Sequence, residues 1–257
     1  MCVIAICEKR KLSSDEIAKM WSANGHGAGM AWTEKGQVCY RKGFMKLVEF
    51  QKFYKSRSFA LPHVVHFRIA SAGAVQPELT HPFTCSIASE LSDHYKGKDE
   101  ALFHNGTYGA WKEVLGTTAM ATGKQVLGAV NDSRLCAILR FLVPDMLPEI
   151  ARTSSSRFAV INPKGHVEWF GAFTEHNGIR TSNSYWQARA GCTDSFVNQC
   201  DSTRSQLTAA DIEDFRRYAN GGKRPSQESL KWTPDRSDSR NYRSVMLHKD
   251  SLVVNGD

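Results

Sequence analysis

Three short stretches of the chain place polar or reactive side chains where apolar residues would pack more easily. Cys2 stands at the head of the apolar run "MCVIAIC", Arg68 lies inside the β-rich run "HFRIASAG", and Asn105 and Gly106 follow the apolar run "ALFH". A thiol can attack a carbonyl carbon, and a guanidinium in an apolar setting must meet a carboxylate. An amide beside a flexible backbone N–H can bind an oxyanion. Together these groups suit nucleophilic chemistry on an amide or ester.

Each stretch also has a plainer interpretation. Cys2 can be a small core residue, because free cysteine is among the most buried residue types. The Arg68 guanidinium can pair with an internal carboxylate, and Asn-Gly is a common turn dipeptide. No stretch decides the function alone, so the order and spacing of several stretches carry the interpretation.

Taken in order, the stretches resemble the class II glutamine amidotransferase domain of the N-terminal-nucleophile hydrolase superfamily. The arginine motif of that family, His-Thr-Arg-x-Ala-Thr-x-Gly followed by His-Pro, resembles residues 66–73 and His81-Pro82. Residues 104–106 match its His-Asn-Gly, residues 131–133 resemble its Ser-Asp-Thr/Ser at the start of a helix, and residues 181–186 resemble its closing segment. The similarity covers roughly residues 2 to 190.

The resemblance implies a catalytic role for three residues. Removal of Met1 would give Cys2 a free α-amine, which acts as the base for its own thiol. The thiolate would attack the side-chain amide of L-glutamine, release ammonia and leave a thioester that water hydrolyses to glutamate. The side-chain amide of Asn105 and the N–H of Gly106 are implied as donors to the oxyanion.

The resemblance also implies a substrate-binding set. Arg68 would clamp the α-carboxylate of glutamine and Asp132 would pair with its α-ammonium group, while Ser71 and His104 belong to the same binding set. His104 is further expected to brace its loop through hydrogen bonds, as is His81.

Some residues depart from the pattern of the family. Ser71 replaces a threonine, and Ile69 and Ala72 stand where some amidotransferases carry tryptophan and histidine. Arg134 follows "NDS", where an acidic residue is common. These departures concern the rim of the pocket and leave the nucleophile unchanged.

The elements that must position these residues are mixed helices and strands. Ser13 and Glu16 form a capping-box pattern before a helix over residues 14–23, and helical spacing predicts another over 132–143. Strands are predicted at residues 2–6, at "HVVHFRIAS", "TCSIAS" and "ALFH", and in two hairpins, "GAGMAW" with "QVCYR" and "RFAVI" with "HVEWFG". The pattern therefore predicts an α+β fold with antiparallel sheets. The resemblance implies the four-layer αββα sandwich of N-terminal-nucleophile hydrolases.

Length and composition indicate one core with an extension. The 257 residues, 41% of them hydrophobic, are interpreted as a glutaminase domain over residues 2–200 and a polar extension over 201–257 with one helix. Charges follow the start closely and no apolar stretch is long enough to span a membrane, so we expect a cytoplasmic protein without a signal peptide. Seven scattered cysteines without a CxxC pair predict neither disulfides nor a metal site, and no cofactor is expected.

Three functions stay open at the level of the sequence. The first is a glutaminase that supplies ammonia to a separate synthetase or acceptor protein, because the chain leaves no room for an acceptor domain. The second is a hydrolase of larger γ-glutamyl amides without ammonia transfer. The third is a non-catalytic scaffold that binds a partner or nucleic acid through its polar tail or through a basic N-terminal face around Lys42 and Lys46. Residues 1–60 hold 11 Lys and Arg against 5 Asp and Glu. Nucleic acid is the less favoured partner, because the aromatic residues there fit the buried stripe of a helix.

Overall fold

The computed structural model describes residues 2–70, 74–124 and 126–188. The chain divides into two units, Met1–Gly191 and Cys192–Asp257, and all described residues belong to the first. The proposed extension over 201–257 and the substrate-binding candidate Ser71 lie outside the described residues, so the domain boundary and the role of Ser71 stay predictions.

Two antiparallel sheets form the centre of this unit. The seven-stranded sheet has the order β10-β11-β1-β4-β2-β3-β6 and the four-stranded sheet the order β5-β7-β8-β9. The first contains β1 (Val3–Cys7), β2 (Ala28–Glu34), β3 (Gln37–Phe44), β4 (His63–Phe67), β6 (His94–Gly97), β10 (Thr174–His176) and β11 (Ile179–Thr181). The second contains β5 (Phe83–Thr84), β7 (Ala101–Asn105), β8 (Arg157–Ile161) and β9 (Val167–Phe170). The predicted α+β class with antiparallel sheets is confirmed.

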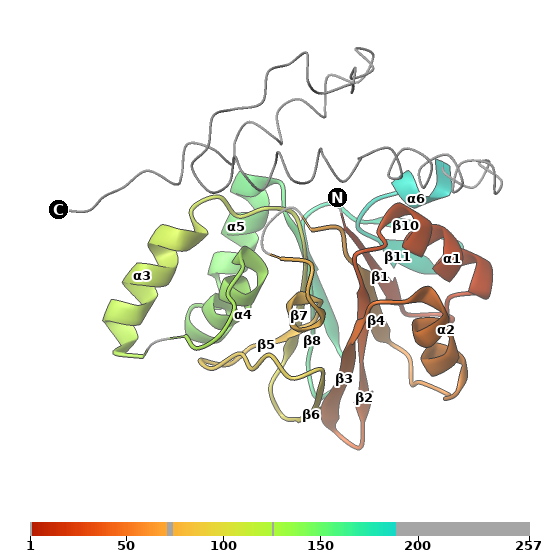
Figure 1. Cartoon of the computed structure of the whole chain (residues 1–257), viewed down its shortest axis with the longest axis horizontal. Coiled ribbons are helices and arrows are strands. Elements are labelled where there is room, and N and C mark those ends of the chain that lie inside the picture. Colours follow the sequence, from red (N-terminus) through yellow and green to blue (C-terminus); the bar gives the residue numbers. More distant parts are fainter. Residues whose placement is uncertain (1, 71–73, 125, 189–257) are drawn as a thin grey trace, which may run out of the picture. The chain divides into compact units, whose positions relative to one another are not determined.

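Helices pack against the outer face of each sheet (Figure 1). They are α1 (Ser14–Ala23), α2 (Leu47–Lys55), α3 (Trp111–Thr122), α4 (Asp132–Leu142), α5 (Met146–Ser154) and α6 (Tyr185–Ala188), with a 3₁₀ turn at Pro77–Leu79. Helix α1 begins with the predicted capping box, in which the Ser13 side chain accepts from Glu16 N and the Glu16 side chain accepts from Ser13 N. Among the described helices, none has the length and apolar content to cross a membrane.

Alternating side chains divide the core into three apolar layers. On β1, Val3, Ala5 and Cys7 face the layer that α1 and α2 cover, whereas Ile4 and Ile6 face the space between the sheets. On β7, Ala101 and Phe103 face the same inter-sheet space, and Leu102 packs under α4 and α5. Cys2 continues the alternation of Ile4 and Ile6, so its side chain belongs to the inter-sheet side and that of Cys7 to the opposite side.

Several predicted elements differ from the structure. The strand of "HVVHFRIAS" ends at Phe67, so Arg68 follows the strand rather than lying inside it. The strand predicted at "TCSIAS" is shorter, since β5 contains only Phe83 and Thr84 and the following residues form bends. The turn begins where Ser86 N donates to Thr84 O, after Cys85 N has donated to Glu100 O. Helices α3 and α5 were not predicted.

Lys42 is buried, so it does not belong to the basic surface that the sequence suggested. Its side chain follows Val38 and Tyr40 along the inner face of β3, and only 1% of the residue is exposed. The ammonium lies 4.2 Å from the centre of the Phe83 ring, and burial lowers its pKa to about 7. A surface role for Lys42 is therefore wrong.

Candidate active site

Cys2 lies at the start of β1, a strand paired on both sides. Its Sγ is 3.3 Å from both the backbone nitrogen and the backbone oxygen of Ile69, and its own carbonyl accepts a 2.6 Å hydrogen bond from Asn183 Nδ2. Burial raises the pKa of the Cys2 thiol, an effect opposed by the Ile69 N–H and by the positive charge of Arg68. The thiol is therefore protonated at neutral pH and needs a base to become a nucleophile.

Arg68 is fixed by its backbone immediately after β4. Its N–H donates to Gly27 O at 2.8 Å and its carbonyl accepts from His26 N at 2.9 Å. Gly27 has a φ of +120°, and a Cβ there would lie 2.7 Å from Thr80 Cγ2, so the position requires glycine. One guanidinium nitrogen, Nη1, donates to Ala74 O at 2.9 Å. The backbone bonds thus hold Arg68 immediately beyond the end of β4.

The charge of Arg68 acts on two other predicted site residues. Burial lowers the pKa of the Arg68 guanidinium, whereas the nearby Cys2 and Asp132 groups oppose that decrease. The Cys2 pKa responds in turn to both Arg68 and Asp132. The structure therefore brings the predicted nucleophile and both predicted binding charges into one electrostatic neighbourhood.

Asp132 is the first residue of α4, and Asn131 caps that helix by accepting from Arg134 N at 2.9 Å. The Asp132 carboxylate accepts from Ser133 N at 2.9 Å through Oδ1 and from Tyr108 N at 3.0 Å through Oδ2. A carboxylate oxygen accepts more than one hydrogen bond, so these bonds orient the group and leave acceptor capacity. Asp132 thus ties the start of α4 to the loop that follows β7.

His104 faces away from the inter-sheet space. Its Nδ1 lies 2.9 Å from Ser133 Oγ and its Nε2 lies 3.0 Å from Ser156 Oγ, while its ring stacks on Phe158 with the centroids 4.5 Å apart. Only 1% of His104 is exposed, and burial lowers its pKa to about 4. These contacts fit the bracing role expected for His104, and its assignment to substrate binding stays a prediction.

Gly106 allows the loop after β7 to approach β8. A Cβ at this position would overlap the Ser156 side chain and lie 2.9 Å from Ser156 Cα. A residue without a side chain is therefore required where the predicted oxyanion donor sits.

Asn105 lies at the end of β7 on the inter-sheet face. Its Nδ2 is 2.8 Å from Ser182 Oγ, and the same hydroxyl accepts a 2.9 Å hydrogen bond from Ile4 N. Asn105 is fully buried, and its Oδ1 has no hydrogen-bond partner among the described residues. Ser182 therefore connects the predicted oxyanion donor with the strand that carries Cys2.

The structure adds residues that the sequence did not single out. Ser182 and Asn183 contact Asn105 and Cys2, and Ser133 and Ser156 hold His104. Ser182 and Asn183 fall within residues 181–186, whose resemblance to the closing segment of the family was the available signal. No motif in the sequence pointed to Ser156.

A pair of neutral histidines lies beside the site. The rings of His66 and His81 are 4.0 Å apart, and His66 Nε2 lies 3.2 Å from the carbonyl oxygen of His104. Burial lowers the pKa of His66 to about 3 and that of His81 well below its ordinary value. Both are therefore uncharged at neutral pH and contribute no cation to the site.

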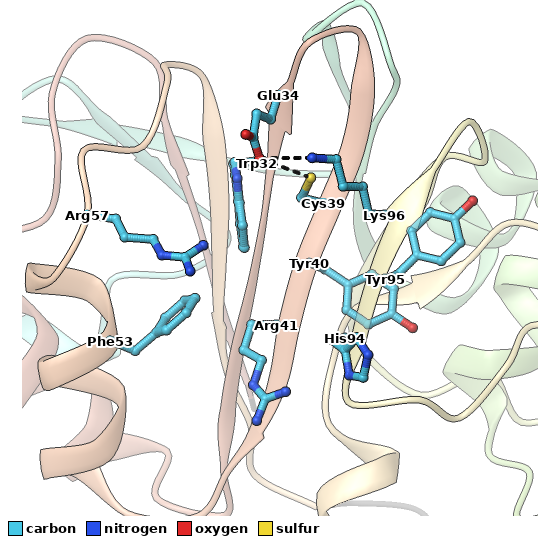
Figure 2. Close-up of a pocket in the computed structure, with 10 residues that line it drawn as sticks. All are labelled: Trp32, Glu34, Cys39, Tyr40, Arg41, Phe53, Arg57, His94, Tyr95 and Lys96. Atoms are coloured by element: carbon cyan, nitrogen blue, oxygen red, sulfur yellow. Dashed lines mark hydrogen bonds and ion pairs between the residues drawn. The ribbon is translucent and has the colours of Figure 1, made fainter.

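A groove of about 530 Å³ lies elsewhere, between α2 and the strands β2, β3 and β6 (Figure 2). None of the predicted site residues lines it. Figure 2 shows the Glu34 carboxylate directed at Lys96, a pair separated by 3.4 Å, and Arg41 pairs with Asp93 at 2.7 Å. Two cations of this groove are thus already paired with carboxylates.

Comparison with known proteins supports the fold. No protein-family model matches the sequence, and a search of curated proteins finds no match by sequence. Among solved structures, the chain is similar to the glutamine phosphoribosylpyrophosphate (PRPP) amidotransferase from B. subtilis, solved with ADP and GMP, with a TM-score of 0.51 and 15% identity over 75% of this chain. A structure described as the allosteric regulatory enzyme of purine biosynthesis matches with a TM-score of 0.48, 16% identity and the same coverage.

The match establishes a fold resembling that of an amidotransferase. It covers 44% of the B. subtilis enzyme chain, so less than half of that protein corresponds to this one. At 15% identity the similarity extends to the fold alone, and the chemistry must be argued from the residues described above.

Proposed function

We propose that this chain is a glutaminase of the class II glutamine amidotransferase type, with the αββα fold of N-terminal-nucleophile hydrolases. The observation that carries the proposal is that Cys2 Sγ lies 3.3 Å from the backbone nitrogen of Ile69, next to Arg68, and that the charges of Arg68 and Asp132 both act on Cys2. Asn105 is joined to β1 through Ser182. The similarity to the fold of an amidotransferase supports the same reading.

In the proposed reaction, Cys2 is the N-terminal residue after removal of Met1. The thiol passes its proton to its own α-amine as Sγ bonds to the side-chain carbonyl carbon of glutamine, and the carbonyl oxygen becomes an oxyanion. Collapse of this intermediate breaks the C–N bond, and the leaving nitrogen takes the proton and departs as ammonia. Water then adds to the thioester carbonyl, the C–S bond breaks, and glutamate leaves with the thiol restored.

The remaining residues bind glutamine and stabilise the charge that develops. The Arg68 guanidinium pairs with the substrate α-carboxylate and the Asp132 carboxylate with the α-ammonium group, so both ends of the amino acid are recognised. Asn105 Nδ2 and the Gly106 N–H donate to the oxyanion, for which one donor contributes about 10²–10³ in rate. Ser71 and His104 complete the proposed binding set.

The ammonia is proposed to pass to a separate acceptor protein or synthetase. The B. subtilis enzyme is an amidotransferase named for glutamine and PRPP, and the part of it that matches this chain is less than half. We therefore do not infer the ammonia acceptor of this protein from that enzyme.

The test is the formation of glutamate and ammonia from glutamine by protein whose mass shows that Met1 is absent. Cys2→Ala is expected to abolish both products and to prevent a covalent adduct with a diazoketone analogue of glutamine. Cys7→Ala is the matched control, because Cys7 is also buried but faces the opposite side of β1. No glutamate and no adduct from the processed protein, alone or with candidate acceptors, would refute the proposal. Faster cleavage of larger γ-glutamyl amides than of glutamine would instead favour the hydrolase without ammonia transfer.

A further inference from the structure

The chain after β4 continues its pairing with the segment before β2 for one more residue. Arg68 N donates to Gly27 O at 2.8 Å, and Arg68 O accepts from His26 N at 2.9 Å. Two residues later the donor Ala70 N bonds to a side chain instead, and donates to the Nδ1 of the His26 ring at 3.1 Å. His26 therefore binds the residue before Ile69 through its backbone and the residue after Ile69 through its ring.

Ile69 directs its polar backbone groups to the other side, where β1 begins. Successive residues of an extended chain direct their N–H and C=O groups to opposite neighbours, and those of Arg68 already bond to the segment before β2. The nitrogen and the oxygen of Ile69 both lie 3.3 Å from Cys2 Sγ. The carbonyl accepts the proton of the thiol, whereas the N–H donates to the sulfur. Only the second bond remains when the thiol loses its proton, so the N–H favours the thiolate.

We propose that His26 is a positioning residue, which holds both neighbours of Ile69 so that the Ile69 N–H is directed at Cys2 Sγ and stabilises the thiolate. The use of that thiolate in catalysis rests on the proposed function, whereas the hydrogen bonds do not. The charges of Arg68 and Asp132 also act on the Cys2 thiol, in opposite directions. The Ile69 N–H adds to these charges a donor in direct contact with the sulfur.

The proposal requires one tautomer of the His26 ring. Because Ala70 N donates to Nδ1, that nitrogen carries no proton, and the proton of the neutral ring lies on Nε2. Nitrogen NMR of the native protein with ¹⁵N-labelled histidine distinguishes protonated from unprotonated ring nitrogens. At about pH 8, above the ordinary pKa of histidine, we expect an unprotonated Nδ1 in His26. A proton on Nδ1 would overturn the inference.

The effect on Cys2 is measured by alkylation, which needs no glutamine. The rate at which iodoacetamide modifies the peptide that contains Cys2 follows the thiolate fraction, so its pH profile gives the pKa of this thiol. His26→Leu removes the acceptor for Ala70 N. We expect it to raise the Cys2 pKa by about one unit, because a hydrogen bond to a charged group contributes about that much.

Two further variants separate the ring acceptor from a general effect on the loop. His26→Asn keeps an acceptor oxygen at the position of Nδ1 and is expected to restore most of the native Cys2 pKa. His26→Gln keeps a polar side chain but moves the acceptor one carbon further out, so it is expected to raise the pKa as His26→Leu does. His166→Leu, at an exposed residue of the turn between β8 and β9, is the control and should leave the profile unchanged.

Two outcomes of the alkylation experiment would contradict the positioning role. The first is a native profile for both His26→Leu and His26→Gln. The second is an equal shift for all three His26 variants, because a loosened loop does not distinguish an acceptor at Nδ1 from one further out.

The consequence for catalysis is measured with the same proteins. A thiol pKa raised by one unit leaves about 10-fold less thiolate at neutral pH, so His26→Leu is expected to lower kcat for glutamine about 10-fold and to recover as the pH is raised. Shifted alkylation profiles with no glutamate from the native protein would refute the proposed function and leave the inference standing. Glutamate from the native protein with unshifted profiles in the variants would refute the inference alone.

Discussion

Gly106 lies where the loop after β7 packs against Ser156, so its missing side chain can be tested directly. Gly106→Ala would bring a Cβ to 2.8 Å from Ser156 Cβ and force the loop away from β8. We expect a loss of about 1–3 kcal/mol in the free energy of unfolding, as for other overpacked sites, and at least a 10-fold lower kcat for glutamine hydrolysis. Urea unfolding and the glutaminase assay measure the two effects.

Gly109→Ala provides the matched control three residues later, where an added Cβ would meet no atom within 4 Å. It is expected to leave both measurements close to those of the native protein. Equal unfolding midpoints for the two variants would contradict the packing argument at Gly106.

Residues of the candidate site could be proposed from the sequence where their chemistry is conspicuous in a local stretch. Cys2, Arg68 and Asn105 each stand out beside apolar neighbours. Ser182 does not, because its contact with Asn105 joins residues 77 positions apart and depends on β11 lying next to β1. The pairing order of strands is a property of the whole sheet, which local patterns do not contain.

Helix α4 is held to two loops by a single buried arginine. Arg134 donates to Ser89 O at 2.7 Å, Leu127 O at 2.7 Å, Ala129 O at 2.9 Å and Ala88 O at 2.9 Å. The guanidinium is thus satisfied by carbonyl oxygens of the segments before β6 and before α4. This accounts for a basic residue after "NDS", where an acidic one was expected from the family.

Arg134→Lys is expected to detach at least one of these segments, because an ammonium group cannot reproduce the planar fork. We expect a loss of about 2–4 kcal/mol in the free energy of unfolding and faster amide exchange in peptides that cover residues 86–92 and 126–131. Hydrogen exchange with mass spectrometry measures the local effect. Arg152→Lys, at a side chain that is 72% exposed, serves as the control. Unchanged exchange in both segments would contradict the role given to Arg134.

Helix α1 was predicted from its capping signal and apolar spacing, whereas α3 and α5 were missed although both carry apolar residues at helical spacing. The capping box and the buried side chains Ile17 and Met20 define α1 in the sequence. Helix α3 buries only Thr118, but Trp111, Val114 and Leu115 pack partly buried on the same face at helical spacing, so the pattern was present and was missed. Helix α5 has Pro148 in its first turn, where proline is tolerated because the N–H groups lack intrahelical partners, although proline usually argues against a helix.

The whole described unit is expected to lose stability in weak acid. Burial lowers the pKa of four histidines. The pKa falls to about 4 for His63 and His104 and to about 3 for His66, and that of His81 lies well below its ordinary value. In the unfolded chain these side chains bind protons below about pH 6.5, whereas in the fold they stay neutral to much lower pH. The unfolded state therefore binds more protons as the pH falls from 6.5 to 5, and stability decreases with it.

The expected loss is about 2 kcal/mol for each buried histidine at pH 5, against a typical total stability of about 5–15 kcal/mol. Urea midpoints should therefore fall steeply between pH 7 and pH 5. Glu16, whose pKa the Arg10 side chain lowers to about 2, contributes a further loss only below about pH 4.5. His94→Gln, at an exposed residue, is the control variant. A midpoint that does not change between pH 7 and pH 5 would contradict the prediction.

The position of β1 between β4 and β11 has a consequence for the order of events during synthesis. A ribosome delivers residues 63–67 long before residues 179–183, so one edge of β1 stays open while most of the unit is being made. Cys2 then lacks the hydrogen bond from Asn183, and Asn105 lacks Ser182. The proposed nucleophile is enclosed only when β11 is added to the sheet, so a growing chain does not yet carry the complete candidate site.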